Sequence, residues 1–189
     1  MQKNWLLLSV LPLLSLAACG INENSDEGNA NLSDFQVSNP QAEATEGDFI
    51  YRLVSEKEQY EQGEPISMYA ELEYTGEKDS VAIYHAASPF YFPMHEATRD
   101  YRIDYPMNEP LLRTEITKGE PLREDYVASG GYSAEEDEDY VEFMQSIISG
   151  NFPPGYYEVD GYANFYIEHN DTSQETYQIS AQIDFKVVE

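Results

Sequence analysis

The fold is decided by the stretch Tyr156-Tyr157-Glu158-Val159-Asp160-Gly161-Tyr162-Ala163-Asn164-Phe165-Tyr166-Ile167-Glu168. Its odd-numbered positions are apolar, aromatic or small, and its even-numbered positions are tyrosine, acidic or amide residues. Side chains alternate between the two faces of a β-strand, so a period of two is typical of an antiparallel strand that buries one face. The sequence therefore predicts a long strand here, with Tyr157 and Val159 among the inward residues.

The same alternation recurs elsewhere along the chain. Two long segments repeat it, with the inward positions Ile66, Met68, Ala70, Leu72 and Tyr74 in one and Tyr177, Ile179, Ala181, Ile183, Phe185 and Val187 in the other. Shorter candidate strands cover residues 49–54, 80–85, 89–95, 100–105, 111–117 and 122–128. Turn sequences such as Gln62-Gly63-Glu64-Pro65 separate them. Many short strands with turns between them indicate a sandwich of two sheets.

One helix is expected to interrupt the strands, over about residues 134–149. Ser133-Ala134-Glu135-Glu136 matches a capping box, in which Ser133 caps the helix start and Glu136 reaches back to it. Apolar side chains then recur at spacings of three and four, at Tyr140, Phe143, Met144, Ile147 and Ile148. Gly150 ends the run. We expect this helix to pack over an open end or edge of the sheets.

The segment 152–159 resembles the turn that enters a late strand of immunoglobulin-like domains. Tyr157 stands two residues before the inward Val159, which is the spacing of a tyrosine corner. Together with Tyr60-x-x-Gly63-Glu64-x-Ile66, this order of elements is similar to small bacterial immunoglobulin-like domains. The resemblance implies a mainly β fold, an immunoglobulin-like antiparallel sandwich over residues 48–189 with one short inserted helix.

The relatives suggested by this resemblance are the intracellular proteinase inhibitor family of bacilli and related surface lipoproteins. The resemblance implies one possible activity, in which a loop such as residues 86–98 would block a protease. It carries no inhibitory residue over by motif.

The N-terminus resembles the lipobox of bacterial lipoproteins. Lys3 precedes an apolar run from Trp5 to Leu16, which is too short to cross a hydrocarbon core of about 30 Å as a helix. Ala17 and Ala18 then lead into Cys19, the chain's single cysteine. The resemblance implies that residues 1–18 are a signal peptide, removed before Cys19, whose sulfur receives a diacylglyceryl group. We therefore expect a membrane-anchored protein on the extracytoplasmic face of a bacterial cell.

Residues 19–47 are expected to form a disordered acidic tether between this anchor and the domain. They are rich in Asn, Ser, Glu, Asp and Gln, and they show no helical or strand period. In an alternative interpretation, Phe35 and Val37 add an edge strand to the domain.

The charge of the chain excludes one class of partner. The sequence has 36 acidic against 10 basic residues and a formal net charge of −26. Binding to nucleic acid independent of sequence requires Lys and Arg opposite phosphates, so nucleic acid is not an expected partner. The expected contact with the membrane is made by the lipid on Cys19.

Catalytic and metal motifs give no specific signal. No Gly-x-Ser-x-Gly, phosphate loop or dinucleotide fingerprint occurs, so we expect neither an enzyme nor a cofactor. The acidic run 135–139 lacks the spacing of a calcium loop and is interpreted as a solvated helix start. His85, His95 and His169 are interpreted as turn and surface residues, since their spacing predicts no zinc site.

Tyrosines on the outward phase of the long strand are the remaining candidates for a site. Tyr156, Tyr162 and Tyr166 share this face, and tyrosine is favoured at binding surfaces. Either packing within the protein covers this face, or the face binds an envelope protein or a wall glycan. The sequence thus predicts a non-catalytic binding or accessory module. The alternatives are a protease-inhibitor-like module or, third, a metal-dependent or hydrolytic enzyme.

Overall fold

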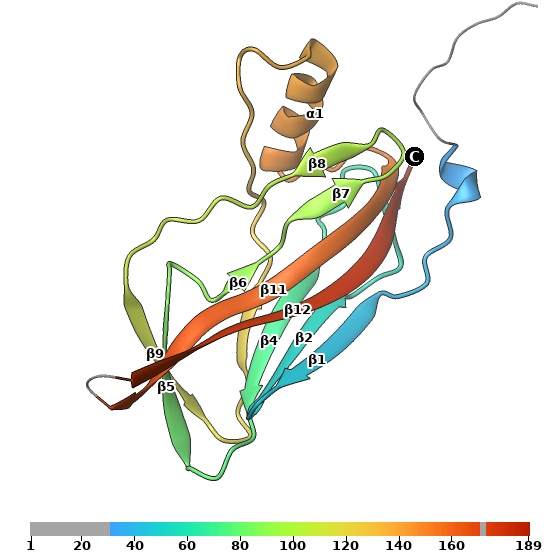
Figure 1. The fold of residues 1–189 in the computed structure, drawn as a ribbon. Helices are drawn as coiled ribbons and strands as arrows, with labels where there is room; N and C mark the ends of the chain where they lie inside the picture. Colours follow the sequence, from blue (N-terminus) through green and yellow to red (C-terminus); the bar gives the residue numbers. More distant parts are fainter. Residues whose placement is uncertain (1–30, 171–172) are drawn as a thin grey trace, which may run out of the picture.

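The computed structural model describes residues 31–170 and 173–189. They form a mainly β protein in which two sheets pack face to face, with one α-helix at one end (Figure 1). The predicted sandwich with a single helix is therefore confirmed. Cys19, the predicted signal peptide and the first part of the predicted tether lie outside the described residues.

The first sheet has four strands in the order β1-β2-β4-β10, all antiparallel. Their bounds are Gln41–Glu46 for β1, Phe49–Ser55 for β2, Met68–Tyr74 for β4 and Leu122–Asp125 for β10. Buried and partly exposed residues alternate strictly along β2 and β4, as the period of two predicts.

The second sheet has the order β3-β12-β11-β5-β9 and is built around the two longest strands. These are β11, which covers Gly155–Asn170, and β12, which covers Ser173–Val188. Beside β12 lies β3 (Gln59–Glu61), and beside β11 lie β5 (Ser80–His85) and then β9 (Leu112–Thr117). The short strands β6, Phe90–Tyr91, and β7, Met94–Glu96, also pair with β11, and β8, Tyr101–Ile103, pairs with β7. Among the strands of the described residues, β3 alone joins its neighbour in parallel.

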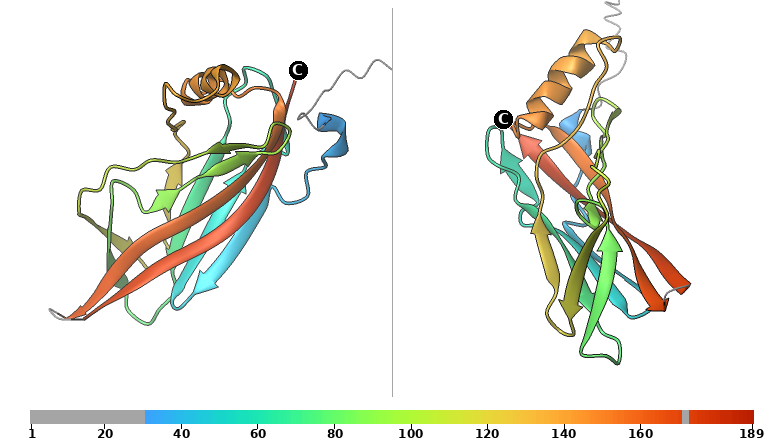
Figure 2. Two further views of the ribbon diagram at one scale, coloured as in Figure 1. Left: turned by 45° about the horizontal axis from the view of Figure 1, so that its top comes forward. Right: turned by 90° about the vertical axis from the view of Figure 1, so that its left-hand side faces the viewer.

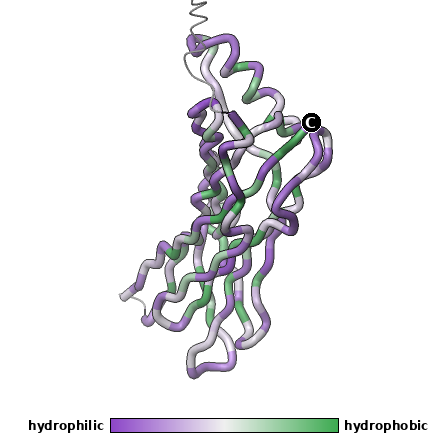
Figure 3. The backbone as a smooth tube through the Cα atoms, turned by 90° about the vertical axis from the view of Figure 1, so that its right-hand side faces the viewer, coloured by the Kyte–Doolittle hydropathy of each residue, from purple (hydrophilic) through white to green (hydrophobic). Residues whose placement is uncertain are grey.

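The core lies between the two sheets. The odd-numbered residues of β11 from Gly155 to Phe165 are buried, and apolar residues recur along the facing strands (Figure 3). The sheets approach each other closely at Gly161, where an added Cβ would lie 2.6 Å from Leu53 Cδ2 and 2.8 Å from the Tyr51 hydroxyl. Only a residue without a side chain fits between these groups, which explains a glycine in the middle of the longest alternation.

Tyr157 makes the hydrogen bond that defines a tyrosine corner. Its hydroxyl donates to the carbonyl oxygen of Pro153 over 2.7 Å, and its ring lies 5.1 Å from that of Phe185 in a stacked arrangement. The side chain is fully buried. It thereby fixes the turn that leads into β11, as its spacing from Val159 predicted.

Tyr157→Phe is expected to lower the free energy of unfolding by about 1–2 kcal/mol. The ring would still fill its place in the core, but the carbonyl of Pro153 would lose its partner. Urea denaturation checks this value, with Tyr132→Phe in an exposed loop as the matched control. A loss below about 0.3 kcal/mol would show that the corner contributes nothing to stability.

The helix α1 begins later than predicted, at Glu138, and ends at Ile148. The predicted capping contacts exist, because the backbone N–H of Ser133 donates to Glu136 Oε2 over 2.6 Å, but they close a separate turn before the helix. Asp137 caps the helix instead, accepting from the Asp139 backbone N–H over 3.1 Å. No helix among residues 31–170 and 173–189 is long and apolar enough to span a bilayer.

The helix covers the end of the sandwich nearest the C-terminus, as Figures 1 and 2 show. Its residues Phe143, Met144 and Ile147 are buried against the sandwich. The ring centroids of Phe143 and of Tyr101 on β8 are 5.1 Å apart. The predicted packing over an open end is therefore confirmed.

Part of the range predicted to be a disordered tether, residues 19–47, is folded. Residues 41–46 form β1, an edge strand in which Ala42 and Ala44 pack against the core, and a 3₁₀ turn, η1, covers Leu32–Asp34. The expectation of disorder up to residue 47 is wrong for this part, because small alanines suffice to cover the edge of a sheet. Phe35 joins the fold by stacking on Tyr156, but it is not part of an edge strand, because that strand begins at Gln41.

Candidate functional site

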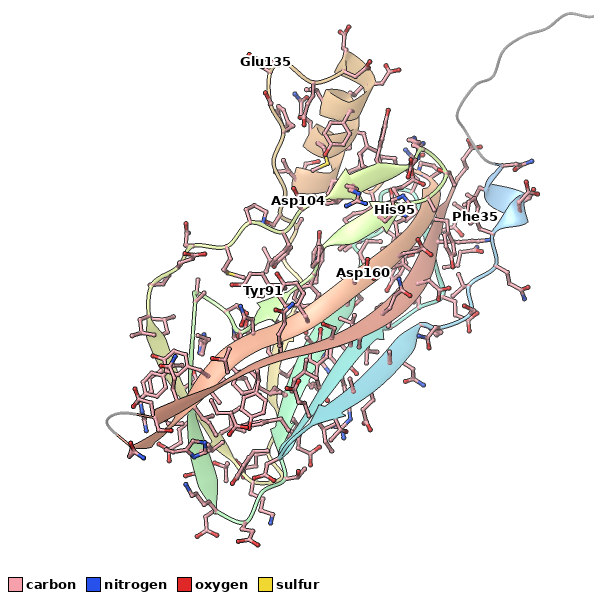
Figure 4. The ribbon with its side chains drawn as sticks, viewed as in Figure 1. Phe35, Tyr91, His95, Asp104, Glu135 and Asp160 are labelled. Carbon is pink, nitrogen blue, oxygen red and sulfur yellow. The ribbon has the colours of Figure 1, made fainter. Side chains whose placement is uncertain are left out.

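Tyr156 does not belong to an exposed face. It is 8% exposed, because the ring of Phe35 stacks on it at a centroid distance of 4.8 Å (Phe35 is labelled in Figure 4). Its hydroxyl donates to Asp184 Oδ2 over 2.5 Å. The prediction that Tyr156 forms part of a binding face is therefore wrong.

Residues 35–39 cover Tyr156, and we call this segment the N-terminal latch. Asp184 holds it in place by hydrogen bonds. Its carboxylate accepts hydrogen bonds from the backbone N–H groups of Ser38, at 3.0 Å, and Asn39, at 2.6 Å, and from the Ser38 hydroxyl at 3.0 Å. Lys186 Nζ donates to the carbonyl oxygen of Phe35. Burial opposes the ionisation of Asp184, but the bonds from Tyr156, Asn39 and Ser38 outweigh it and lower the pKa of the carboxyl.

Tyr162 and Tyr166 remain half-buried on the outward side of β11, each stacked on a tyrosine of a neighbouring strand. Tyr162 lies opposite Tyr91 on β6, with ring centroids 4.7 Å apart and planes 7° apart. Tyr166 lies opposite Tyr84 on β5, at 5.0 Å and 10°. Aromatic residues directly across a strand pair stabilise one another in this way. Burial raises the pKa of Tyr91 and of Tyr162 above the usual tyrosine value.

A hollow of about 270 Å³ opens beside these stacked rings. Its lining includes Tyr84, Tyr91, Asn164, Tyr166 and Thr176. On its far side lie Glu109, Pro110 and Leu111, and the side chain of Leu111 is 69% exposed. Its volume is close to the lower end of the range for small-ligand pockets, about 300 Å³. We call Tyr84, Tyr91, Tyr162 and Tyr166, with Asn164 between the last two, the tyrosine face.

The strand β12 continues this surface with uncharged polar side chains. Its register places Thr176, Gln178 and Ser180 directly opposite Tyr166, Asn164 and Tyr162. The outward row is completed by Gln174 and Gln182, and all five side chains are exposed. Gln182 Nε2 donates to Asp160 Oδ1 over 2.8 Å and so marks the end of the row. We call these five residues the polar row.

Sequence reasoning found two of the four tyrosines but missed Tyr84, Tyr91 and the polar row. Tyr84 and Tyr91 lie far from β11 in the chain, so only the strand register brings them there. The polar row had a signal in the sequence: every second residue from 174 to 182 is an uncharged hydroxyl or amide residue.

The three histidines each bond to separate partners. His85 is buried and bonds Thr114 Oγ1 at 2.8 Å, and His169 bonds Glu175 at 2.9 Å. His95 lies between Glu158, at 3.1 Å, and Asp100, at 2.8 Å. Burial opposes protonation of His95, but both carboxylates outweigh it and raise its pKa.

The acidic surface around His95 includes Asp104 and Asp160, labelled in Figure 4. In the described part of the chain, no group of three His, Cys, Asp or Glu residues has the geometry to hold a metal ion. Glu135, at the start of the acidic run, is exposed in the turn before α1.

The segment proposed as an inhibitory loop, residues 86–98, is paired with β11 along much of its length. It contains β6 and β7, and Phe90, Phe92, Met94 and Glu96 within it are buried. A protease requires an extended, accessible segment, so this geometry does not favour inhibition through residues 86–98.

Comparison with known proteins gave no assignment: no protein-family model matches the chain, and a search of curated proteins found no match.

Proposed function

We propose that this chain is a lipid-anchored, non-catalytic binding module on the extracytoplasmic side of a bacterial envelope, and that it holds its ligand on the tyrosine face. One observation carries the binding role: Tyr84, Tyr91 and Tyr166 line an open hollow on a paired sheet, and Tyr162 stacks on Tyr91 beside it. Tyrosine offers a large contact area at little loss of conformational entropy. Sites built on paired strands are also held in place before the ligand arrives.

The anchoring part of the proposal is supported by the residues around Cys19. An apolar run and two alanines lead directly into a single cysteine, as in a lipobox. A diacylglyceryl group on that sulfur, with two chains, would hold a protein stably, whereas one chain gives only marginal binding. The net charge of −26 gives the domain no electrostatic attraction to an anionic surface, so a covalent anchor would be needed to keep it there.

Cys19→Ser is expected to move the protein from the membrane fraction to the medium, or to leave it with its signal peptide uncleaved. The reason is that serine has no sulfur to accept the diacylglyceryl group. Cell fractionation and incorporation of labelled palmitate measure this, in a Gram-positive host expressing the full chain. Ser15→Ala, in the same segment, is the matched control and should keep both the label and the membrane location. Retention of the Cys19→Ser protein in the membrane would contradict the anchor.

The binding part is tested with isolated bacterial envelopes and the full-length protein. Tyr166→Ala is expected to lower retention on envelopes at least tenfold, since it removes one ring of a stacked pair and one wall of the hollow. Tyr132→Ala, in the exposed loop before α1, should bind like the unaltered protein. Equal retention of the two variants would remove the tyrosine face from consideration as the site.

A further inference from the structure

We infer that the ligand of the tyrosine face is an uncharged polysaccharide chain, which also runs along the polar row of β12. This inference rests on the proposed binding function and names the chemistry of its ligand. It joins two sets of residues that the strand register places side by side, the tyrosine face on β5, β6 and β11 and the polar row on β12.

The first step concerns charge. Charged residues make up 24% of the sequence, yet none of the ten residues of the tyrosine face and the polar row is charged. Charges return at the borders, with Glu168 opposite Gln174, Asp160 opposite Gln182 and Arg113 opposite Tyr84. A polyanion would be repelled by the acidic surroundings, and a cationic segment would find carboxylates only at the border, at Glu109, Glu168 and Asp160, and none among the ten residues themselves. An uncharged polar ligand matches this surface best.

The second step concerns hydrogen bonding. Each glutamine of the polar row, like Asn164, offers both a carbonyl acceptor and two N–H donors, and Thr176 and Ser180 offer hydroxyls. Sugar hydroxyls both donate and accept, so such groups can pair with them whichever way the chain lies. The faces of sugar rings carry C–H groups, which pack on the negative faces of aromatic rings. Tyrosines beside amides therefore supply both kinds of contact that a sugar ring needs.

The third step concerns shape. Every second residue of a strand lies on the same face, so the polar row repeats about every 7 Å and extends about 27 Å from Gln174 to Gln182. A straight, regularly spaced row suits a ligand that is itself a linear repeat. The hollow beside Tyr84 and Tyr166 would hold one sugar unit, and the row would hold its neighbours.

A protein partner fits this surface less well. Protein interfaces are dominated by a few large anchors in a desolvated centre, with a polar rim around them. Here the polar row and Asn164 run through the surface, and the exposed apolar side chain Leu111 lies to one side, at the hollow. This arrangement differs from that of a protein–protein interface, in which large anchors fill the centre and polar residues form the rim.

The test uses full-length protein and three sets of particles: untreated envelopes, envelopes digested with protease, and wall sacculi stripped of both protein and polyanions. A parallel panel holds insoluble cellulose, chitin, starch and β-1,3-glucan. We expect retention on the stripped sacculi or on a member of this panel, persisting in 1 M NaCl, where the Debye length falls to about 3 Å. Tyr166→Ala and Tyr84→Ala should each lower the affinity at least tenfold, and Tyr132→Ala should leave it unchanged.

A second variant tests the charge argument at an exposed position, where a substitution should not disturb folding. Gln178→Lys alters an exposed side chain in the middle of the polar row. It should lower retention on the uncharged glycan and leave circular dichroism and thermal unfolding as in the unaltered protein. If it instead strengthened binding, the ligand would be a polyanion and the inference would be wrong.

The outcomes separate this inference from the proposed function. Binding that depends on Tyr166 but disappears after protease treatment would identify a protein ligand, which overturns the glycan and leaves the binding module. Binding that disappears when polyanions are removed would also overturn it. Binding to envelopes that does not depend on Tyr84 or Tyr166 would overturn both.

Discussion

Glu96→Ala is expected to lower the free energy of unfolding by about 3–5 kcal/mol, because it removes a fully buried carboxylate and leaves Arg99 and the other donors that bond to it without partners. The carboxylate of Glu96 is 0% exposed. It accepts hydrogen bonds from the backbone N–H of Thr98, at 2.9 Å, from that of Arg99, at 3.0 Å, and from the Thr98 hydroxyl. Arg99 Nη1 completes the set at 3.1 Å.

The position of Glu96 explains why so much would depend on it. The same carboxylate accepts the backbone N–H of Tyr156 over 3.3 Å, while Arg99 also donates to the carbonyl oxygen of Pro154 over 3.0 Å. Glu96 therefore joins the turn between β7 and β8 to the start of β11. Gly155 leaves room for it, since a Cβ there would lie 2.5 Å from Glu96 Oε1.

The measurement is urea denaturation of the purified full-length protein at neutral pH. Glu96→Gln keeps the shape of the side chain but not its charge, so its free energy of unfolding should lie between those of the unaltered protein and of Glu96→Ala. Glu77→Ala, at an exposed turn, is the matched control and should lie within about 0.5 kcal/mol of the unaltered protein. A loss below about 1 kcal/mol for Glu96→Ala would show that water replaces the lost contacts.

Asp184→Asn is expected to release the N-terminal latch and to lower stability by about 2–3 kcal/mol. Hydrogen bonds to a charged group contribute more than neutral ones. Asparagine would also place an N–H group next to the N–H donors of Ser38 and Asn39, which cannot accept it. Faster hydrogen exchange at these two amides, and proteolytic cleavage near Phe35, would measure the release. The matched control is Asp79→Asn in an exposed turn, and protection that remains unchanged in Asp184→Asn would contradict the latch.

The same latch should weaken in acid without any substitution. Since the pKa of Asp184 is lowered in the folded protein, its ionised form stabilises the fold above the ordinary aspartate pKa of about 3.9. That contribution is lost as the pH falls through the lower, folded-state pKa. The NMR shifts of the Ser38 and Asn39 amides should therefore titrate with a midpoint below about 3.9, and this titration should vanish in Asp184→Asn.

The sequence predicted those features that depend on local periodicity. The alternation along β11 identified the buried face down to Phe165, and the spacing of Tyr157 from Val159 identified the corner. The start of α1 was misplaced because Ser133 and Asp137 are both good caps four residues apart, and local pattern does not decide between them. Strand β1 was missed because its inward residues are alanines, which give little hydrophobic signal.

The candidate site was predictable only in part, for a different reason. Tyr162 and Tyr166 followed from the phase of one strand, but Tyr156 on the same phase is covered by Phe35, more than a hundred residues away in the chain. Tyr84 and Tyr91 reach the face through pairings with Tyr166 and Tyr162, which lie 82 and 71 residues away in the chain. Such contacts depend on which strands become neighbours, and no local pattern specifies that.

The N-terminal latch and the Tyr84–Tyr166 pair lie at opposite ends of β11. Residues 35–39 are fixed beside Tyr156 and Asp184, at the end of the sandwich where α1 lies, and Tyr166 stands ten residues further along β11, about 33 Å away. Under the proposed attachment through Cys19, the segment that leads to the anchor joins the domain at the latched end, so the Tyr84–Tyr166 pair lies at the opposite end of β11 from the point of attachment. Such a module would reach for polymers in the surroundings or in neighbouring cells sooner than for material lying against its own membrane.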